Sequence, residues 1–167
     1  MRTKAAAIAG SAGFLVIAPG VVAGLVPWWL TGWQQGAEWP VPVRVAGGLL
    51  ITAGAATLLG SFAQFALEGR GTPAPPAPTE HLVVRGVYRY VRNPMYLSVT
   101  AIVLGEVMLT RSRALLGYWA VWFLAANLFV LLYEEPTLRE RFGPSYEAYT
   151  QRVGRWLPRF RSRPDAG

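Results

Sequence analysis

The chain contains no cysteine and only one histidine, His81, among its 167 residues. The absence of thiols excludes disulfides, thiolate metal sites and a cysteine nucleophile. One histidine cannot complete a metal site by itself, so we expect no resident metal. Charged residues are also scarce, at 15% of the chain, against about 25% in a typical soluble domain. This shortage of charge favours a membrane protein.

Apolar residues make up 53% of the chain, and the mean hydropathy is +0.30. The net charge is +7, which in other settings indicates a nucleic-acid partner. Here the basic residues lie between and after apolar segments, where they set topology and contact anionic headgroups. We therefore expect one membrane-embedded domain over residues 1–167 and no nucleic-acid partner.

Four apolar runs predict membrane-spanning helices, at residues 5–30, 45–67, 95–109 and 114–133. A helix needs about 20 apolar residues to cross the hydrocarbon core. The run at 95–109 is short and contains Glu106, so we expect it to be tilted or partly buried. A signal peptide is the alternative for the first run, because Arg2 and Lys4 precede it. The fold class predicted is an all-α membrane protein with about four transmembrane helices, the first two forming an N-terminal pair over 1–67.

Local signals refine this helical pattern. Pro19 predicts a kink in the first run. Small residues, including GVVAG at 20–24, would let helices approach closely, although composition alone also explains them. The segment EGRGTPAPPAPT at 68–79 predicts an exposed loop. The short connection TRSR at 110–113 predicts an antiparallel hairpin of the third and fourth helices.

The polar C-terminal segment predicts a further helix, with Pro144 in its first turn. At helical spacing, one face would carry Tyr146, Tyr149, Val153 and Trp156. Nearby arginines favour an amphipathic helix at the membrane surface. A helix that packs on the rest of the protein is the alternative, and both interpretations can hold together.

The distribution of basic residues predicts the orientation. Four spans would place both termini and the loop between the second and third spans on one side. Of the 16 lysines and arginines, that side would hold all except Arg44, Arg111 and Arg113. The positive-inside rule then makes the termini cytoplasmic. We expect an integral protein of a bacterial inner membrane.

Two polar features lie on this predicted cytoplasmic side. The segment RGVYRYVRNPMYLS at 85–98 holds three arginines and three tyrosines, as interfacial segments often do. The second feature is the pair Glu134 and Glu135, which is costly at a membrane helix end unless solvated or partnered. Glu135 and Arg139 are four residues apart and could pair on a helix. The sharper interpretation is that one carboxylate faces a cofactor.

The ordered motifs carry a family resemblance. LVVRGVYRYVRNPMYLS, followed after a hairpin by EEPTLRERFGPSYEAYTQRVGRWLPRF, resembles the isoprenylcysteine carboxyl methyltransferase family and its phospholipid methyltransferase relatives. The match covers residues 80–160. It implies an integral membrane enzyme that uses S-adenosylmethionine without a Rossmann domain, and the chain has no G-x-G-x-x-G opening a helix after a strand.

The resemblance also implies a cytoplasm-facing cofactor pocket. Carried over by position, its contacts would be Glu80, His81, Leu82, Val83, Tyr88, Asn93, Pro94, Met95, Tyr96 and Glu134. The family's histidine before Leu-Val lies one place later here, as His81. Backbone amides near Pro94 could face an anionic carboxylate, and the two tyrosines offer aromatic faces to a sulfonium or adenine. No acid–base catalyst is assigned.

The sequence indicates the methyl acceptor only by its chemical class. The arginine that isoprenylcysteine enzymes carry one turn before the acidic pair is replaced by Val130, which counts against a prenylcysteine carboxylate. We therefore expect a lipid or small hydrophobic acceptor, with Trp119, Trp122 and Asn127 as contacts or as bundle packing. The alternatives are an NADPH-dependent enzyme of the sterol-reductase type and a non-catalytic, lipid-binding membrane scaffold.

Overall fold

The computed structural model describes residues 13, 16–34, 39–68 and 82–159, and every element in this part of the chain is helical. In chain order these are η1 (Val21–Leu25), α2 (Val26–Thr31), α3 (Val41–Glu68), η2 (Gly86–Arg89), α4 (Pro94–Thr110), α5 (Arg113–Phe129), η3 (Val130–Glu134), α6 (Glu135–Phe142) and α7 (Pro144–Arg152). Over the same ranges, the β pairing is one isolated parallel bridge between Val91 and Gly154. The prediction of an all-α protein is confirmed.

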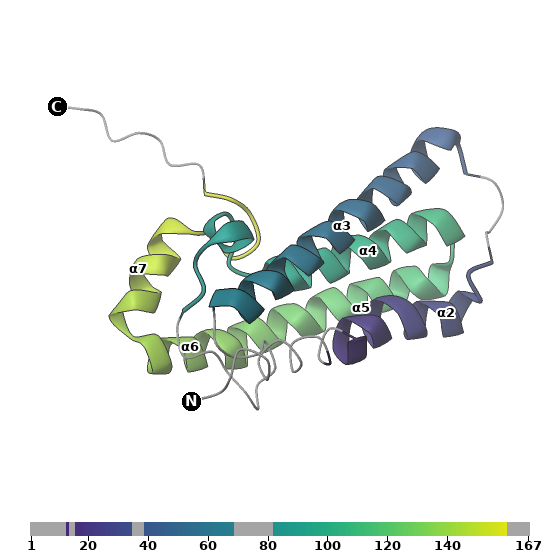
Figure 1. Ribbon diagram of the computed structural model, residues 1–167. Coiled ribbons are helices and arrows are strands. Elements are labelled where there is room, and N and C mark those ends of the chain that lie inside the picture. Colours follow the sequence, from purple (N-terminus) through teal and green to yellow (C-terminus); the bar gives the residue numbers. More distant parts are fainter. Residues whose placement is uncertain (1–12, 14–15, 35–38, 69–81, 160–167) are drawn as a thin grey trace.

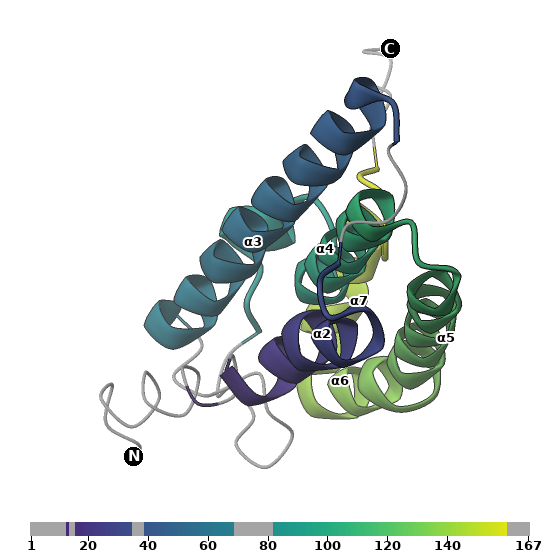
Figure 2. The ribbon, with the colours of Figure 1, turned by 90° about the vertical axis from the view of Figure 1, so that its right-hand side faces the viewer.

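The N-terminal helix (Val16–Thr31, which contains η1 and α2) lies side by side with α3, α4 and α5 as a bundle, and α6 and α7 gather at one end of it (Figures 1 and 2). The bundle core contains Leu58 and Phe62 of α3, Val99, Ile102 and Val103 of α4, and Leu115 of α5. The predicted hairpin of α4 and α5 is present. Arg111 ends α4 in a left-handed conformation, and the Ser112 hydroxyl caps α5 by accepting from the Leu115 amide at 3.2 Å.

The number of long membrane helices differs from the prediction. Within the described residues, two helices are long and apolar enough to cross a membrane, Val41–Gln64 and Arg113–Phe142, where we expected about four. The helix Val16–Thr31 and α4 are apolar but shorter. α4 has 17 residues, so it is about 25 Å long, against roughly 30 Å of hydrocarbon. Pro94 and Arg111 fix its two ends, which explains why this run stays short.

Small residues do bring helices together between α3 and α4, whereas Gly24 of the 20–24 stretch makes no such close approach. A Cβ on Gly105 would lie 2.6 Å from the carbonyl oxygen of Gly47, and one on Gly54 would lie 2.8 Å from that of Ser98. Gly24 has nothing within 4 Å of such an atom. The close packing predicted from small residues therefore belongs to the second and third apolar runs.

The N-terminal helix is irregular just after Pro19, where η1 has π-helical bonding. The Val26 amide bonds to the Val21 carbonyl, and Pro27 has no N–H to offer to Val22. The Tyr118 hydroxyl of α5 supplies the missing donor, at 2.9 Å from the Val22 carbonyl oxygen. One side-chain hydrogen bond therefore fastens the N-terminal helix to α5.

The C-terminal segment packs on the protein. α7 begins at Pro144, as predicted, and buries Tyr146 and Tyr149. These side chains cluster with Val153 and contact Leu82, Leu138 and Phe142. The helix ends at Arg152, with Val153 in an extended conformation, so Trp156 does not share a helical face with the tyrosines, and that part of the prediction is wrong. Val91 pairs with Gly154 at this point, which draws the chain out of the helix.

Candidate functional site

A cavity of about 440 Å³ lies among α3, η2, the start of α4, the η3–α6 junction and α7. Eight of the ten residues that the family resemblance selected line it. They are Leu82, Val83, Tyr88, Asn93, Pro94, Met95, Tyr96 and Glu134. The other two, Glu80 and His81, lie outside the described residues. The motif segments at 82–96 and at the acidic pair, about 40 residues apart in sequence, therefore share one cavity.

Tyr96 and Glu134 form a direct link across this cavity. The Tyr96 hydroxyl in the first turn of α4 donates to Oε2 of Glu134 at 3.0 Å. The Tyr96 ring also lies 6.4 Å from the ring of Trp122 and 6.5 Å from that of Phe129, measured between centroids. Among the salt bridges of the described residues, none includes Glu134. Its carboxylate is therefore bound by a neutral hydroxyl and bordered by aromatic rings.

Local backbone irregularities place these two side chains. Pro94 is the first residue of α4, where its missing N–H costs nothing and its fixed φ suits a helix start. On the other side, η3 has π-helical bonding, with the Glu135 amide bonded to the Val130 carbonyl. Pro136 follows and cannot donate to Leu132, so a regular α turn is impossible here. Such π segments are frequent at functional sites, because they change the direction of the side chains that follow.

Tyr88 in η2 forms another wall of the cavity. Its side chain is buried, and its backbone carbonyl accepts from the Tyr149 hydroxyl of α7 at 2.7 Å. Burial and the nearby Glu134 carboxylate raise the pKa of the Tyr88 phenol well above its usual value. Burial also raises the pKa of Tyr149. Both phenols therefore stay neutral at physiological pH, and Tyr149 holds η2 against α7.

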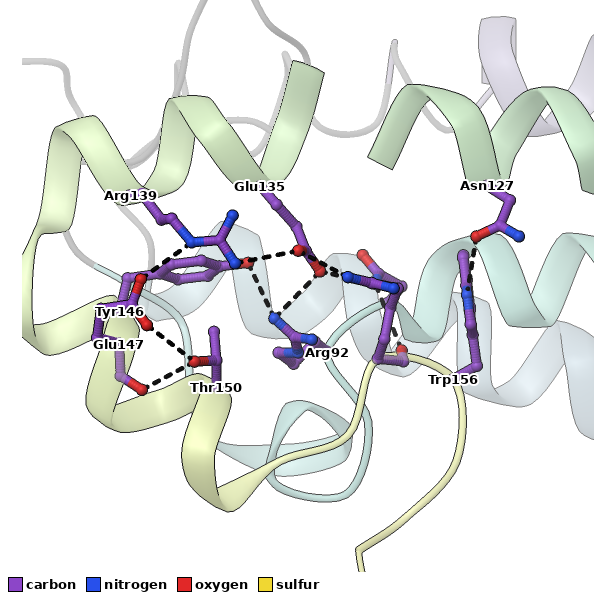
Figure 3. Close-up of polar contacts among 10 residues, drawn as sticks. Arg92, Asn127, Glu135, Arg139, Tyr146, Glu147, Thr150 and Trp156 are labelled. Atoms are coloured by element: carbon purple, nitrogen blue, oxygen red, sulfur yellow. Dashed lines mark hydrogen bonds and ion pairs between the residues drawn. The ribbon is translucent and has the colours of Figure 1, made fainter. Parts of the chain in front are cut away.

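Glu135, the second acid of the pair, has entirely different surroundings (Figure 3). It is 3% exposed and binds Arg155 through two contacts of 2.7 and 2.9 Å. Arg92 lies 3.1 Å away and Arg139 3.5 Å away. The predicted Glu135–Arg139 pair is present, but it is the longest of these contacts. The hydrogen bond to Glu135 also raises the pKa of Arg155.

Arg92 and Arg155 are the residues that sequence reasoning missed. We assigned both to the cytoplasmic surface, yet the Arg92 side chain is only 9% exposed and lines the cavity. It donates to the Tyr146 hydroxyl at 3.3 Å. The next residue, Asn93, donates to the Arg155 carbonyl at 3.3 Å. The separation of 20 residues between Glu135 and Arg155 follows no helical spacing, so only the tertiary fold reveals their pairing.

The three residues predicted to contact the acceptor have different surroundings in the structure. Trp122 lines the cavity, and its indole nitrogen is buried without a hydrogen-bond partner. Trp119 donates instead to the Thr100 carbonyl at 3.1 Å. Asn127 accepts from the Trp156 indole at 3.1 Å, as Figure 3 shows. Trp119 and Asn127 therefore hold helices and the C-terminal segment together, and only Trp122 reaches the cavity.

Among the remaining cavity walls, those on the N-terminal helix, on α3 and at Val99 had no motif to indicate them, whereas those on α6 fall within the C-terminal motif segment. They include Ala18, Pro19 and Val22 of the N-terminal helix, Leu58 and Phe62 of α3, Val99 of α4, and Thr137, Leu138, Arg141 and Phe142 of α6. Most of these side chains are apolar. The cavity thus combines the Glu134 carboxylate, which is in none of the salt bridges of the described residues, with several aromatic rings and an apolar wall, whereas the second lining carboxylate, Glu135, is paired with arginines. This chemistry suits a ligand with a cationic centre. Within the described ranges, no three histidine or acidic residues gather as a possible metal site.

Two comparisons with known proteins bear on this site. The family model for phospholipid methyltransferase matches residues 43–145 of the chain. A protein of Haemophilus influenzae, described as uncharacterized, is 41% identical over 64 residues, which are 38% of this chain and 100% of that protein. The family match covers α3 to the start of α7, and so includes both motif walls of the cavity.

Proposed function

We propose that this chain, which belongs to the phospholipid methyltransferase family, is a membrane enzyme that transfers a methyl group from S-adenosylmethionine to a lipophilic acceptor. Family membership makes it a membrane methyltransferase, and the proposal adds the methyl donor and the class of acceptor. The observation that carries it is the meeting of the two motif segments at one cavity, where Tyr96 bonds to Glu134 at 3.0 Å.

The residues present fit S-adenosylmethionine, which supplies a methyl group on a sulfonium centre. The rings of Tyr88 and Tyr96 can lie against the positive sulfur or the adenine. Glu134 can accept hydrogen bonds from an amine or from ribose hydroxyls. The free backbone amides at the start of α4 suit the cofactor's carboxylate. Arg92 is held by Glu135, so its charge does not neutralise the Glu134 side of the cavity.

Methyl transfer requires little of the protein beyond holding the methyl donor and the acceptor in the correct positions. Bound S-adenosylmethionine would supply an activated methyl group that a lone pair of the acceptor could attack, with a neutral thioether as the leaving group. Holding the acceptor in line with the breaking bond supplies most of the acceleration. A carboxylate acceptor needs no base, whereas an ammonium acceptor must first lose a proton. In that second case, Glu134 is placed to accept it, because the other cavity carboxylate, Glu135, is paired with arginines.

The distribution of basic residues supports a cytoplasmic position for the cavity. The start of α3 and the α4–α5 connection, which carry Arg44, Arg111 and Arg113, lie at one end of the bundle (Figure 1). α6 and α7, which contribute residues to the cavity lining, lie at the other end (Figure 1), together with the described segments that carry the arginines at 85–92 and 139–159. This segregation is the pattern that the positive-inside rule expects.

Incubation of membranes containing the protein with methyl-labelled S-adenosylmethionine tests the proposal. We expect label in a lipid-soluble product that is absent from membranes without the protein. Because Glu134→Gln removes the cavity carboxylate that bonds to Tyr96, it should lower this incorporation at least tenfold. Glu140→Gln is the matched control, since Glu140 is an exposed acid on the same helical segment. Binding of NADPH without binding of S-adenosylmethionine would favour a reductase instead.

A further inference from the structure

We infer that the apolar wall of the cavity is a subsite for the hydrocarbon chain of the acceptor, and that the N-terminal helix is its specificity-determining side. This inference rests on the proposed methyl transfer to a lipophilic molecule. We call the wall the tail subsite. Its members are Ala18, Pro19 and Val22 of the N-terminal helix, Leu58 and Phe62 of α3, and Val99 of α4.

The cavity lies between two separate apolar clusters. Leu58, Phe62 and Val99 belong to the bundle core, and Val22 packs against the same cluster. Tyr146 and Tyr149, on another wall, belong to the cluster formed by α7. Glu134 and Tyr96 also line the cavity. A ligand with a polar reacting group at Glu134 and an apolar chain would therefore find a matching surface for each part.

The tail subsite is separated from the bilayer by single helices. On the N-terminal helix, Ala18 lines the cavity, whereas Val16 and Ile17 are 72% and 69% exposed. On α3, Leu58 is 7% exposed and its neighbour Leu59 is 57% exposed. These exposed apolar side chains suit contact with lipid. A chain passing beside the N-terminal helix would thus move directly from hydrocarbon into the tail subsite.

The N-terminal wall is fixed in place although it precedes the family match, which begins at residue 43. Tyr118 binds the Val22 carbonyl at 2.9 Å, on the residue whose side chain lines the subsite. The shared family region therefore supplies the motif walls, and a segment outside it supplies this part of the apolar wall. Differences in which acceptors are accepted would then arise from this helix.

Selection at such a subsite is steric. A chain that leaves the bilayer for an apolar cavity gains little free energy, because lipid tails are as apolar as the cavity wall. The subsite therefore accepts or rejects a chain by the space it offers. Ala18 is a small residue at this wall, so enlarging its side chain should exclude the chain without changing the cofactor walls.

Photo-crosslinking tests the subsite directly. The full-length protein is placed in nanodiscs of phosphatidylethanolamine and phosphatidylglycerol doped with a phospholipid that carries a diazirine in one acyl chain. Mass spectrometry then compares labelling of Leu58 and Phe62, which face inward, with labelling of the exposed Leu59. We expect labelled inward residues in the native protein and at least fivefold less inward labelling, relative to Leu59, in Ala18→Phe.

Val16→Phe is the matched control, because it adds the same ring to an exposed position of the same helix and should leave the ratio unchanged. Ala18→Leu provides a smaller enlargement if the phenylalanine variant does not fold. Equal inward labelling in Ala18→Phe and Val16→Phe, or none in the native protein, would overturn the tail subsite. Calorimetry with S-adenosylmethionine separates the two proposals. Normal cofactor binding with failed inward labelling contradicts the subsite alone, whereas selective labelling without cofactor binding contradicts the methyl donor.

Discussion

Two adjacent acids show how differently neighbouring residues can be used. Consecutive helical residues point about 100° apart, so Glu134 faces the cavity and Tyr96, while Glu135 faces three arginines. Glu135 joins α6 to Arg92 beside the Asn-Pro motif and to Arg155 of the C-terminal segment. We therefore regard Glu135 as a positioning residue that holds the cofactor walls together, and Glu134 as the residue that contacts the ligand.

Glu135→Gln should destabilise the protein strongly. Removing one partner of a buried ion pair typically costs about 3–5 kcal/mol, because the remaining charge stays buried without compensation. Arg92 would be left in that state. The measurement is thermal unfolding in detergent, with Glu147→Gln as control, since the Arg139–Glu147 pair is exposed and should contribute less than about 1 kcal/mol. Equal melting temperatures for the two variants would refute the positioning role.

The buried tyrosines predict an alkaline limit to stability. Burial raises the pKa of Tyr88 and Tyr149, so the folded protein keeps both protons where the unfolded chain loses them. This contribution is complete below the unfolded pKa of about 10 and is lost as pH rises through and above it. Melting temperatures measured from pH 8 to 11 should fall above pH 10, and less steeply in Tyr149→Phe. A variant with an unchanged slope would contradict this assignment.

At the scale of elements, the contact between α3 and α4 positions the first motif wall. The two helix backbones are in close contact at Gly47 and Gly105. This contact fixes the position of α4 along α3, and therefore the positions of Pro94 and Tyr96. The C-terminal segment then closes the other side through the Val91–Gly154 bridge and the Tyr149–Tyr88 hydrogen bond. The cavity thus depends on contacts between elements that are distant in sequence.

Gly105→Ala should separate α3 from α4. Its new Cβ would lie 2.6 Å from the Gly47 carbonyl oxygen, so the helices must move apart, at a cost of roughly 1–3 kcal/mol. Gly117→Ala is the control, because nothing lies within 4 Å of a Cβ there and alanine favours a helix by roughly 0.5–1 kcal/mol. In unfolding experiments, Gly105→Ala should be less stable than the native protein and Gly117→Ala more stable. A stabilised Gly105→Ala would rule out the close contact.

At the scale of the whole molecule, the sequence predicted those features of the fold that depend on local residue patterns. Apolar runs predicted the helices, TRSR predicted the hairpin, and Pro144 predicted the start of α7. The family resemblance selected residues that meet at one cavity. Where the structure disagreed, the cause was tertiary. Arg92 appeared to be a surface charge until Glu135 was placed beside it, and the apolar wall at Ala18 and Val22 has no local signature.

The most direct test of the central claim is calorimetric titration of S-adenosylmethionine into the purified protein in detergent, with Glu134→Gln and Glu140→Gln measured beside it. We predict saturable heat for the native protein and for Glu140→Gln. Glu134→Gln should bind at least tenfold more weakly, a loss of about 1.4 kcal/mol, at an unchanged melting temperature. Absence of heat in well-folded native protein, or equal affinity in all three proteins, would contradict the account.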